Sequence, residues 1–164
     1  MKRLLVLLLI IPCLIGCSST KIQKPASFYY PPVDYIYAQN GSFLDFEVRE
    51  TVDCLNVGNM LELYMKGPEN QRFINPFPSN CKILSLQHYG SKVELVISNE
   101  FAALNGISLP IACASLAKTC MELTGAEIIT IRTKSQPLGG SKQIVLTKDT
   151  LHISSGIFTV ETND

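Results

Sequence analysis

The sequence has no tryptophan, only two histidines and little charge. Charged residues make up 17% of the chain, below the ~25% usual for globular proteins, and 14 basic residues balance 14 acidic ones. A chain without a basic excess offers no electrostatic footprint for a phosphate backbone, so we expect no nucleic acid partner. The length of 164 residues fits one ordinary domain plus an appended segment.

Catalytic chemistry is also poorly represented. His88 and His152 are the only imidazole bases; the first is predicted at the solvated end of a strand and the second in a C-terminal tail. No Gly-x-Ser-x-Gly, His-Glu-x-x-His, Gly-x-Gly-x-x-Gly or Gly-rich Lys-Ser loop occurs. Asp45 and Glu47 would suit a carboxylate dyad, but ordinary solvent-facing alternation along a strand explains them. We therefore predict a protein that is not an enzyme and has no cofactor or metal.

The N-terminus carries the clearest signal in the chain. Met1 to Arg3 form a basic region, an apolar run follows from Leu4 to Ile11, and Pro12 ends it. The run is too short to span a bilayer, which needs about 20 apolar residues. The tetrapeptide Leu14-Ile15-Gly16-Cys17 resembles a bacterial lipobox, in which the cysteine is diacylated and becomes the first residue. We predict lipidation of Cys17 and anchoring to one leaflet; the alternative is an ordinary secretory signal in which Cys17 is incidental.

Residues 17–32 are predicted to form a flexible tether. The segment contains polar residues, three prolines and no periodicity. The run Phe28-Tyr29-Tyr30 inside it is either a patch that docks a partner or meets the membrane interface, or a set of aromatics that pack back on the edge of the next domain.

The following segments alternate between strand and helix patterns. We predict a strand over 33–38, a turn at Asn40-Gly41 and a second strand in which Asp45, Glu47 and Arg49 form the wet face. Helical spacing predicts an amphipathic helix over 54–66, ended by Gly67-Pro68.

The second half contains a further hairpin, a helix and a strand, and the sequence has no internal repeats. A hairpin is predicted within 79–99, with Val93, Leu95 and Ile97 on one face. A helix beyond Pro110 ends at Thr124-Gly125, and a central strand follows over 126–133. The run Ile144-Val145-Leu146 is a candidate edge strand.

Four cysteines lie beyond Cys17 and the signal. Cys113 and Cys120 are seven residues apart on one predicted helix, about 10.5 Å, which is too far for a disulfide, so we predict both as small core residues. Cys54 and Cys81 are free to pair if the exterior is oxidising, and the spacing leaves that question open. The sequence contains no Cys-x-x-Cys pair, the spacing typical of a zinc site.

The order of these pieces resembles the sporulation and spore germination (GerMN) domain family. The family pattern has an aromatic strand, a turn with Gly, a strand leading to Arg and a hydrophobic residue, a helix ending in Gly-Pro, a proline before a hairpin, a Ser-x-x-Phe segment and a final strand. In this sequence the corresponding residues are, in the same order, Tyr35-Ile36-Tyr37, Asn40-Gly41, Arg49 with Val52, Tyr64 to Pro68, Pro78, Ser98 to Phe101 and Ile128 to Ile131. It implies an α+β fold of ββαββαβ order, with a mostly antiparallel sheet and two helices on one face, related to ring-building motifs. It also implies a non-enzymatic lipoprotein on the outer face of a Gram-positive membrane.

The predicted organisation is a lipoprotein signal over 1–16, the lipidated Cys17 and tether over 17–32, a GerMN-like domain over 33–134 and a C-terminal extension over 135–164. The predicted function is interaction or scaffolding at the cell envelope, linked to sporulation or germination. The predicted partners are the membrane, through the acyl chains on Cys17, and envelope proteins or a second copy, with peptidoglycan as a further candidate. The alternative is an accessory protein that binds or hydrolyses peptidoglycan. With no tryptophan, a glycan-stacking platform would have to be built from tyrosine.

Overall fold

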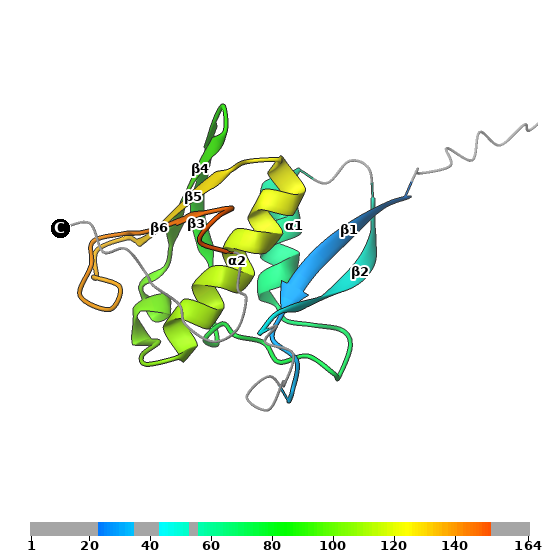
Figure 1. Cartoon of the computed structure of the whole chain (residues 1–164), viewed down its shortest axis with the longest axis horizontal. Coiled ribbons are helices and arrows are strands. Elements are labelled where there is room, and N and C mark those ends of the chain that lie inside the picture. Colours follow the sequence, from blue (N-terminus) through cyan, green and yellow to red (C-terminus); the bar gives the residue numbers. More distant parts are fainter. Residues whose placement is uncertain (1–22, 35–42, 53–55, 152–164) are drawn as a thin grey trace, which may run out of the picture.

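The computed structural model describes residues 23–34, 43–52 and 56–151, and Figure 1 shows how their helices and strands are arranged. The elements, in chain order, are β1 (Gln23–Tyr30), β2 (Asp45–Val52), α1 (Val57–Met65), β3 (Ile83–Tyr89), β4 (Lys92–Ile97), the 3₁₀ helix η2 (Asn99–Ala103), α2 (Ser108–Thr124), β5 (Ile128–Thr133) and β6 (Ile144–Thr147). The predicted α+β class and the ββαββαβ order are confirmed, and the candidate edge strand is present as β6.

The strands form two sheets where one was expected. β1 and β2 make an antiparallel hairpin, and the second sheet has the order β3-β4-β5-β6, in which only β4 and β5 run parallel. The helices lie between the hairpin and the four-stranded sheet (Figure 1). The hairpin stays separate because the helices bond the free edge of β1: the Tyr29 N–H donates to Thr119 Oγ1 at 2.9 Å, and the Tyr64 hydroxyl donates to Tyr29 O at 2.6 Å.

The tether interpretation is wrong for residues 23–32, which belong to the folded domain. Phe28 and Tyr30 of β1 are fully buried, and both rings pack against Tyr64 of α1. Of the two alternatives for these aromatics, the structure therefore shows packing on the domain for Phe28 and Tyr30, whereas Tyr29 is half-buried on the other face of the strand. Val33 and Asp34 form a turn, not a strand, and the rest of the predicted 33–38 strand lies outside the described residues, as does the Asn40-Gly41 turn.

The second strand is confirmed as β2, but its two faces are inverted relative to the prediction. Glu47 and Arg49 are 8% and 7% exposed, whereas Phe46 and Val48 are 46% and 56% exposed. Alternation alone assigns apolar residues to the core. Here Glu47 and Arg49 face the core instead, because hydrogen bonds within the domain pair their buried polar atoms.

Helix α1 begins and ends with the expected chemistry. The Asn56 side chain accepts the Asn59 N–H at 2.9 Å as the N-cap, and the helix ends at Met65, one residue before the predicted end. Gly67 has φ +104°, which confirms the left-handed C′ glycine. The predicted start at residue 54 lies outside the described residues.

Gly67→Val is expected to lower the free energy of unfolding by about 2 kcal/mol or more, because a β-branched residue is strained at positive φ. A Cβ at this position would also meet Asn75 Nδ2 at 2.9 Å. Gly90→Val is the matched control, since Gly90 has φ +59° with open space around it. Urea unfolding measures both; a Gly67→Val loss no larger than that of Gly90→Val would contradict the close approach of Asn75.

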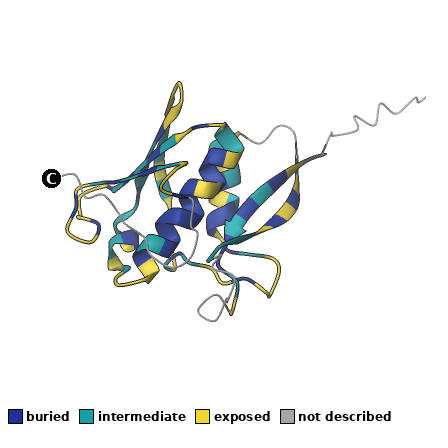
Figure 2. Cartoon of the chain, in the orientation of Figure 1, coloured by how far each residue is buried: buried dark blue, intermediate teal, exposed yellow. Residues whose placement is uncertain are grey.

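Helix α2 is buried around most of its circumference because it lies between the two sheets. Figure 2 shows the buried residues gathered on the central helices. Cys113 and Cys120 are fully buried free thiols, as predicted from their spacing with Leu116. Gly125, with φ +73°, closes the helix as expected, and Val93, Leu95 and Ile97 of β4 face the same core.

Candidate functional site

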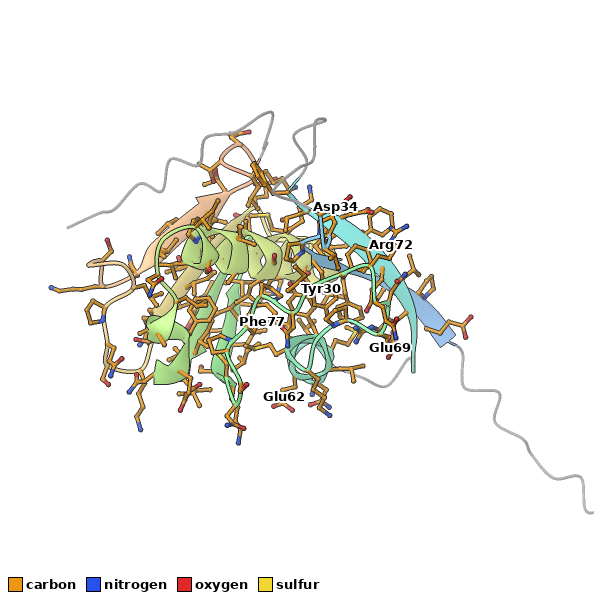
Figure 3. The ribbon with its side chains drawn as sticks, turned by 90° about the horizontal axis from the view of Figure 1, so that it is seen from below. Tyr30, Asp34, Glu62, Glu69, Arg72 and Phe77 are labelled. Atoms are coloured by element: carbon orange, nitrogen blue, oxygen red, sulfur yellow. The ribbon has the colours of Figure 1, made fainter. Side chains whose placement is uncertain are left out.

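A groove of about 610 Å³ runs between α1 and the first residues of β3. One wall is the C-terminal half of α1, with Glu62 and the buried Met65, and Lys66 directly after it. Glu62 projects from the side of this helix opposite Tyr30 (Figure 3). The other wall is the segment from Cys81 to Leu84. The groove therefore combines an apolar floor with a rim of charged side chains.

The groove adjoins the edge of the four-stranded sheet. Within the part of the chain that the structure describes, β3 has a strand neighbour on one side only, namely β4. The pairing between these strands is irregular between Ile83 and Ser85, and Leu84, at this irregularity, is 50% exposed. Edge strands with an exposed apolar residue are places where another extended chain is able to pair.

The turn before β3 gives the groove a fixed end. The Cys81 N–H donates to Pro78 O at 3.2 Å, and Asn80 has a φ of 64°, which asparagine tolerates better than most residues. The Asn75 side chain accepts the Phe77 N–H at 3.1 Å. Backbone and side-chain bonds thus hold the loop that closes the groove.

A buried ion pair on β2 anchors the start of the same loop. Arg49 bonds to Glu47, and Arg49 Nη2 also donates to Gly67 O at 2.7 Å. The Glu47 carboxylate accepts the backbone N–H groups of Glu69 and Asn70 at 3.2 and 3.0 Å. The pair therefore fastens the chain after α1 to the hairpin, and Arg49, a residue of the GerMN-like pattern, has a structural role.

This network also changes the interpretation of the two acids on β2. Glu47 is held by Arg49, while Asp45, at the solvent-exposed start of β2, bonds Arg72 at 2.8 Å. The solvent-facing explanation is wrong for Glu47, because that side chain is buried. Each carboxylate has its own arginine, so the two do not share a site as a dyad would.

Cys81 lines the groove as a neutral thiol. Burial raises its pKa to about 11, and a contact with Ser98 opposes part of that rise. A cysteine nucleophile needs a lowered pKa. Cys81 is a free thiol in the structure, and Cys54, its candidate disulfide partner, lies outside the described residues.

We expect maleimide labelling of native Cys81 to be about a hundredfold slower at neutral pH than labelling of an unperturbed thiol, because only the thiolate reacts. The rate should rise tenfold per pH unit up to about pH 11. Peptide mapping by mass spectrometry of the labelled full chain measures the rate, and fully buried Cys113 is the internal control. Fast labelling of Cys81, or recovery of a disulfide-linked Cys81 peptide, would contradict this account.

The other sequence candidates have simple outcomes. His88 is exposed on β3, in agreement with a solvated strand-end histidine. Cys17 and His152 lie outside the described residues, so lipidation remains a prediction.

Among residues 23–34, 43–52 and 56–151, no three His, Cys, Asp or Glu side chains group to hold a metal ion. No helix in those ranges has the length and apolar character to cross a bilayer.

Comparison with solved structures identifies the architecture. The chain matches the tandem GerMN domains of the sporulation protein GerM from Bacillus subtilis, with a TM-score of 0.57 and 12% sequence identity. The chain has a GerMN-like fold. The match covers 74% of this chain, which spans 43% of the length of that tandem structure. A protein from Clostridium perfringens described as a lipoprotein has a TM-score of 0.46 at 16% identity, over 77% of this chain and 89% of that one.

No protein-family model matches the sequence, and no curated protein does so either. The GerMN-like fold nevertheless confirms the resemblance found in the sequence. The motif pieces have defined places in it: Gly67 ends α1, Phe101 is buried in η2, and Ile128 to Ile131 lie in β5.

The groove itself was missed at the level of sequence. Leu84 lies in an ordinary strand pattern, and nothing in that pattern distinguishes an edge strand from a central one. Lys66 and Lys82 line one groove only because α1 packs beside β3.

Proposed function

We propose that this chain is a non-catalytic, lipid-anchored protein of the cell envelope whose GerMN-like domain binds a partner polypeptide in the groove beside β3. The observation that carries the proposal is the position of the groove directly beside a sheet edge that is open among the described residues. The Leu14-Ile15-Gly16-Cys17 signal supports anchoring on the outer face of the membrane.

The groove favours an extended chain over a compact small molecule. Its second wall runs from Cys81 into the first two residues of β3, Ile83 and Leu84, and an edge strand is able to pair with an added strand. Met65, Ile83 and Leu84 offer apolar contacts for alternate side chains of such a segment. Binding by strand addition takes affinity from backbone hydrogen bonds and specificity from these contacts.

The charges at the rim define the chemistry of the partner. Lys66 and Lys82 are exposed, and Glu62 is the acidic residue that lines the same groove. This excess of positive charge favours an extended segment that carries acidic side chains. The similarity to a sporulation protein makes the envelope of sporulating cells the first place to look for it.

Affinity capture from detergent-solubilised membranes tests the binding site. The double variant Lys66→Glu, Lys82→Glu should lose the partner that the wild-type chain captures, because the rim charge reverses. Lys148→Glu is the matched control, since Lys148 follows β6 at the opposite edge of the sheet. Equal capture by both variants would contradict the groove as the binding site. Capture of peptidoglycan fragments alone would favour the accessory role in wall binding instead.

Anchoring has a separate test. Cys17→Ala should abolish incorporation of a palmitate analogue during growth, because the thiol is the predicted site of acylation. Undiminished label on the variant would show that the signal does not direct lipidation at Cys17.

A further inference from the structure

The outer face of the β1–β2 hairpin carries two exposed apolar side chains of β2, next to exposed Glu50, although the inner face holds an ion pair. Phe46 and Val48 point outward and are 46% and 56% exposed. Tyr29 pairs with Phe46 in register, so both lie on that outer face, with ring centroids 5.6 Å apart. Lys118 Nζ lies 5.4 Å from the centre of the Tyr29 ring. We call Tyr29, Phe46 and Val48 the hairpin patch.

This composition suits the boundary between water and lipid. Single exposed apolar residues are common and need no explanation, but here two exposed residues and the half-buried Tyr29 share one face of two paired strands. Aromatic residues with an adjacent lysine are typical of membrane interfaces, where the ring enters the headgroup region and the ammonium stays in water.

The position of the patch in the chain points to the same surface. β1 begins at Gln23, six residues after Cys17. Six residues reach at most about 20 Å when fully extended. A lipidated Cys17 therefore keeps the start of β1 within about 20 Å of the outer leaflet, far closer than a tether ending at residue 32 would.

We propose that the hairpin patch lies on the outer leaflet of the phospholipid bilayer that holds the Cys17 lipid. This inference rests on the proposed lipid anchor. The four-stranded sheet lies on the other side of the helices from the hairpin, so this contact turns the sheet toward the exterior (Figure 1). The anchor then holds the domain at the membrane, and the hairpin sets its orientation.

The absence of tryptophan gives this proposal a direct probe. Phe46→Trp in the lipidated full chain introduces a single tryptophan at the centre of the patch. The chain is reconstituted in vesicles of phosphatidylcholine and phosphatidylglycerol, with or without dibrominated acyl chains that quench nearby indoles. Tyr89→Trp is the matched control, because Tyr89 is 62% exposed on β3 of the four-stranded sheet. Val48→Trp serves as a second probe if Phe46→Trp does not fold.

We expect brominated lipid to quench the patch probe at least twofold and to leave the Tyr89→Trp probe unchanged. Equal quenching of the two probes, or quenching of neither in vesicle-bound protein, would overturn the orientation and leave the anchor intact. A blue-shifted patch probe that lipid does not quench would show that a second protein surface covers the patch, and this also overturns the proposal. Failure of the wild-type chain to carry a lipid would instead contradict the proposed anchor, and flotation with the vesicles detects it.

Discussion

Arg49→Met is expected to lower the free energy of unfolding by about 3 to 5 kcal/mol, because it leaves the buried Glu47 carboxylate without its cation. Arg49 is 7% exposed and bonds to both Glu47 and Gly67 O, so the substitution also releases the loop after α1. Urea unfolding followed by circular dichroism measures the loss.

The hairpin supplies a matched control for this prediction. Arg72 also bonds a carboxylate of β2, Asp45, but its side chain is 61% exposed. Surface pairs of this kind are worth about 0 to 1 kcal/mol, so Arg72→Met should change stability little. The double variant Glu47→Leu, Arg49→Met should recover part of the loss, because it removes both buried charges. Equal losses for Arg49→Met and Arg72→Met would contradict the burial of the Glu47–Arg49 pair.

Phe28→Ala is expected to destabilise the domain by about 3 to 5 kcal/mol, the usual range for removing a buried aromatic side chain. Phe28 is fully buried, and its ring stacks on Tyr64 with centroids 5.7 Å apart. Arg49 also lies 5.1 Å from the ring centre. A thermal or urea unfolding curve of the full chain gives the value.

Phe46→Ala is the control on the neighbouring strand. Phe46 is 46% exposed on the outer face of the hairpin, so its loss should cost less than about 1 kcal/mol. If Phe28→Ala lowered the free energy of unfolding as little as Phe46→Ala, residues 23–30 would behave as a tether, and the folded domain would begin after β1.

The elements predicted best are those whose signals are local. The helical spacing in α1, the glycines at 67 and 125, and the alternation of Val93, Leu95 and Ile97 all depend on residues close in sequence. Local periodicity and capping residues therefore predicted their position to within a few residues.

β1 was not predicted as a strand, because the composition of residues 23–30 obscures their alternating pattern. Ala26, Phe28 and Tyr30 alternate toward the core, but prolines and polar residues around them favoured a tether. The face of β2 was inverted for a different reason. Glu47 and Arg49 turn inward only because the backbone N–H groups after α1 bond the carboxylate, and those partners lie more than twenty residues away.

The candidate site was outside the reach of sequence patterns. Its two walls, α1 and the start of β3, become one groove only through tertiary packing. The sheet order that leaves β3 at an edge depends on the parallel pairing of β4 with β5, which skips over α2 in the chain. Such long-range pairing leaves no local mark in the strands that it joins.

Site-specific photo-crosslinking tests the central claim, which is that a partner polypeptide occupies the groove beside β3. A benzophenone amino acid at position 84 replaces the exposed Leu84, and the same group at position 142 replaces exposed Lys142 near β6, at the opposite edge of the sheet. The proposal predicts that irradiation of intact cells links one polypeptide to position 84 and not to position 142. No product at position 84, or the same products at both positions, would contradict the proposed function.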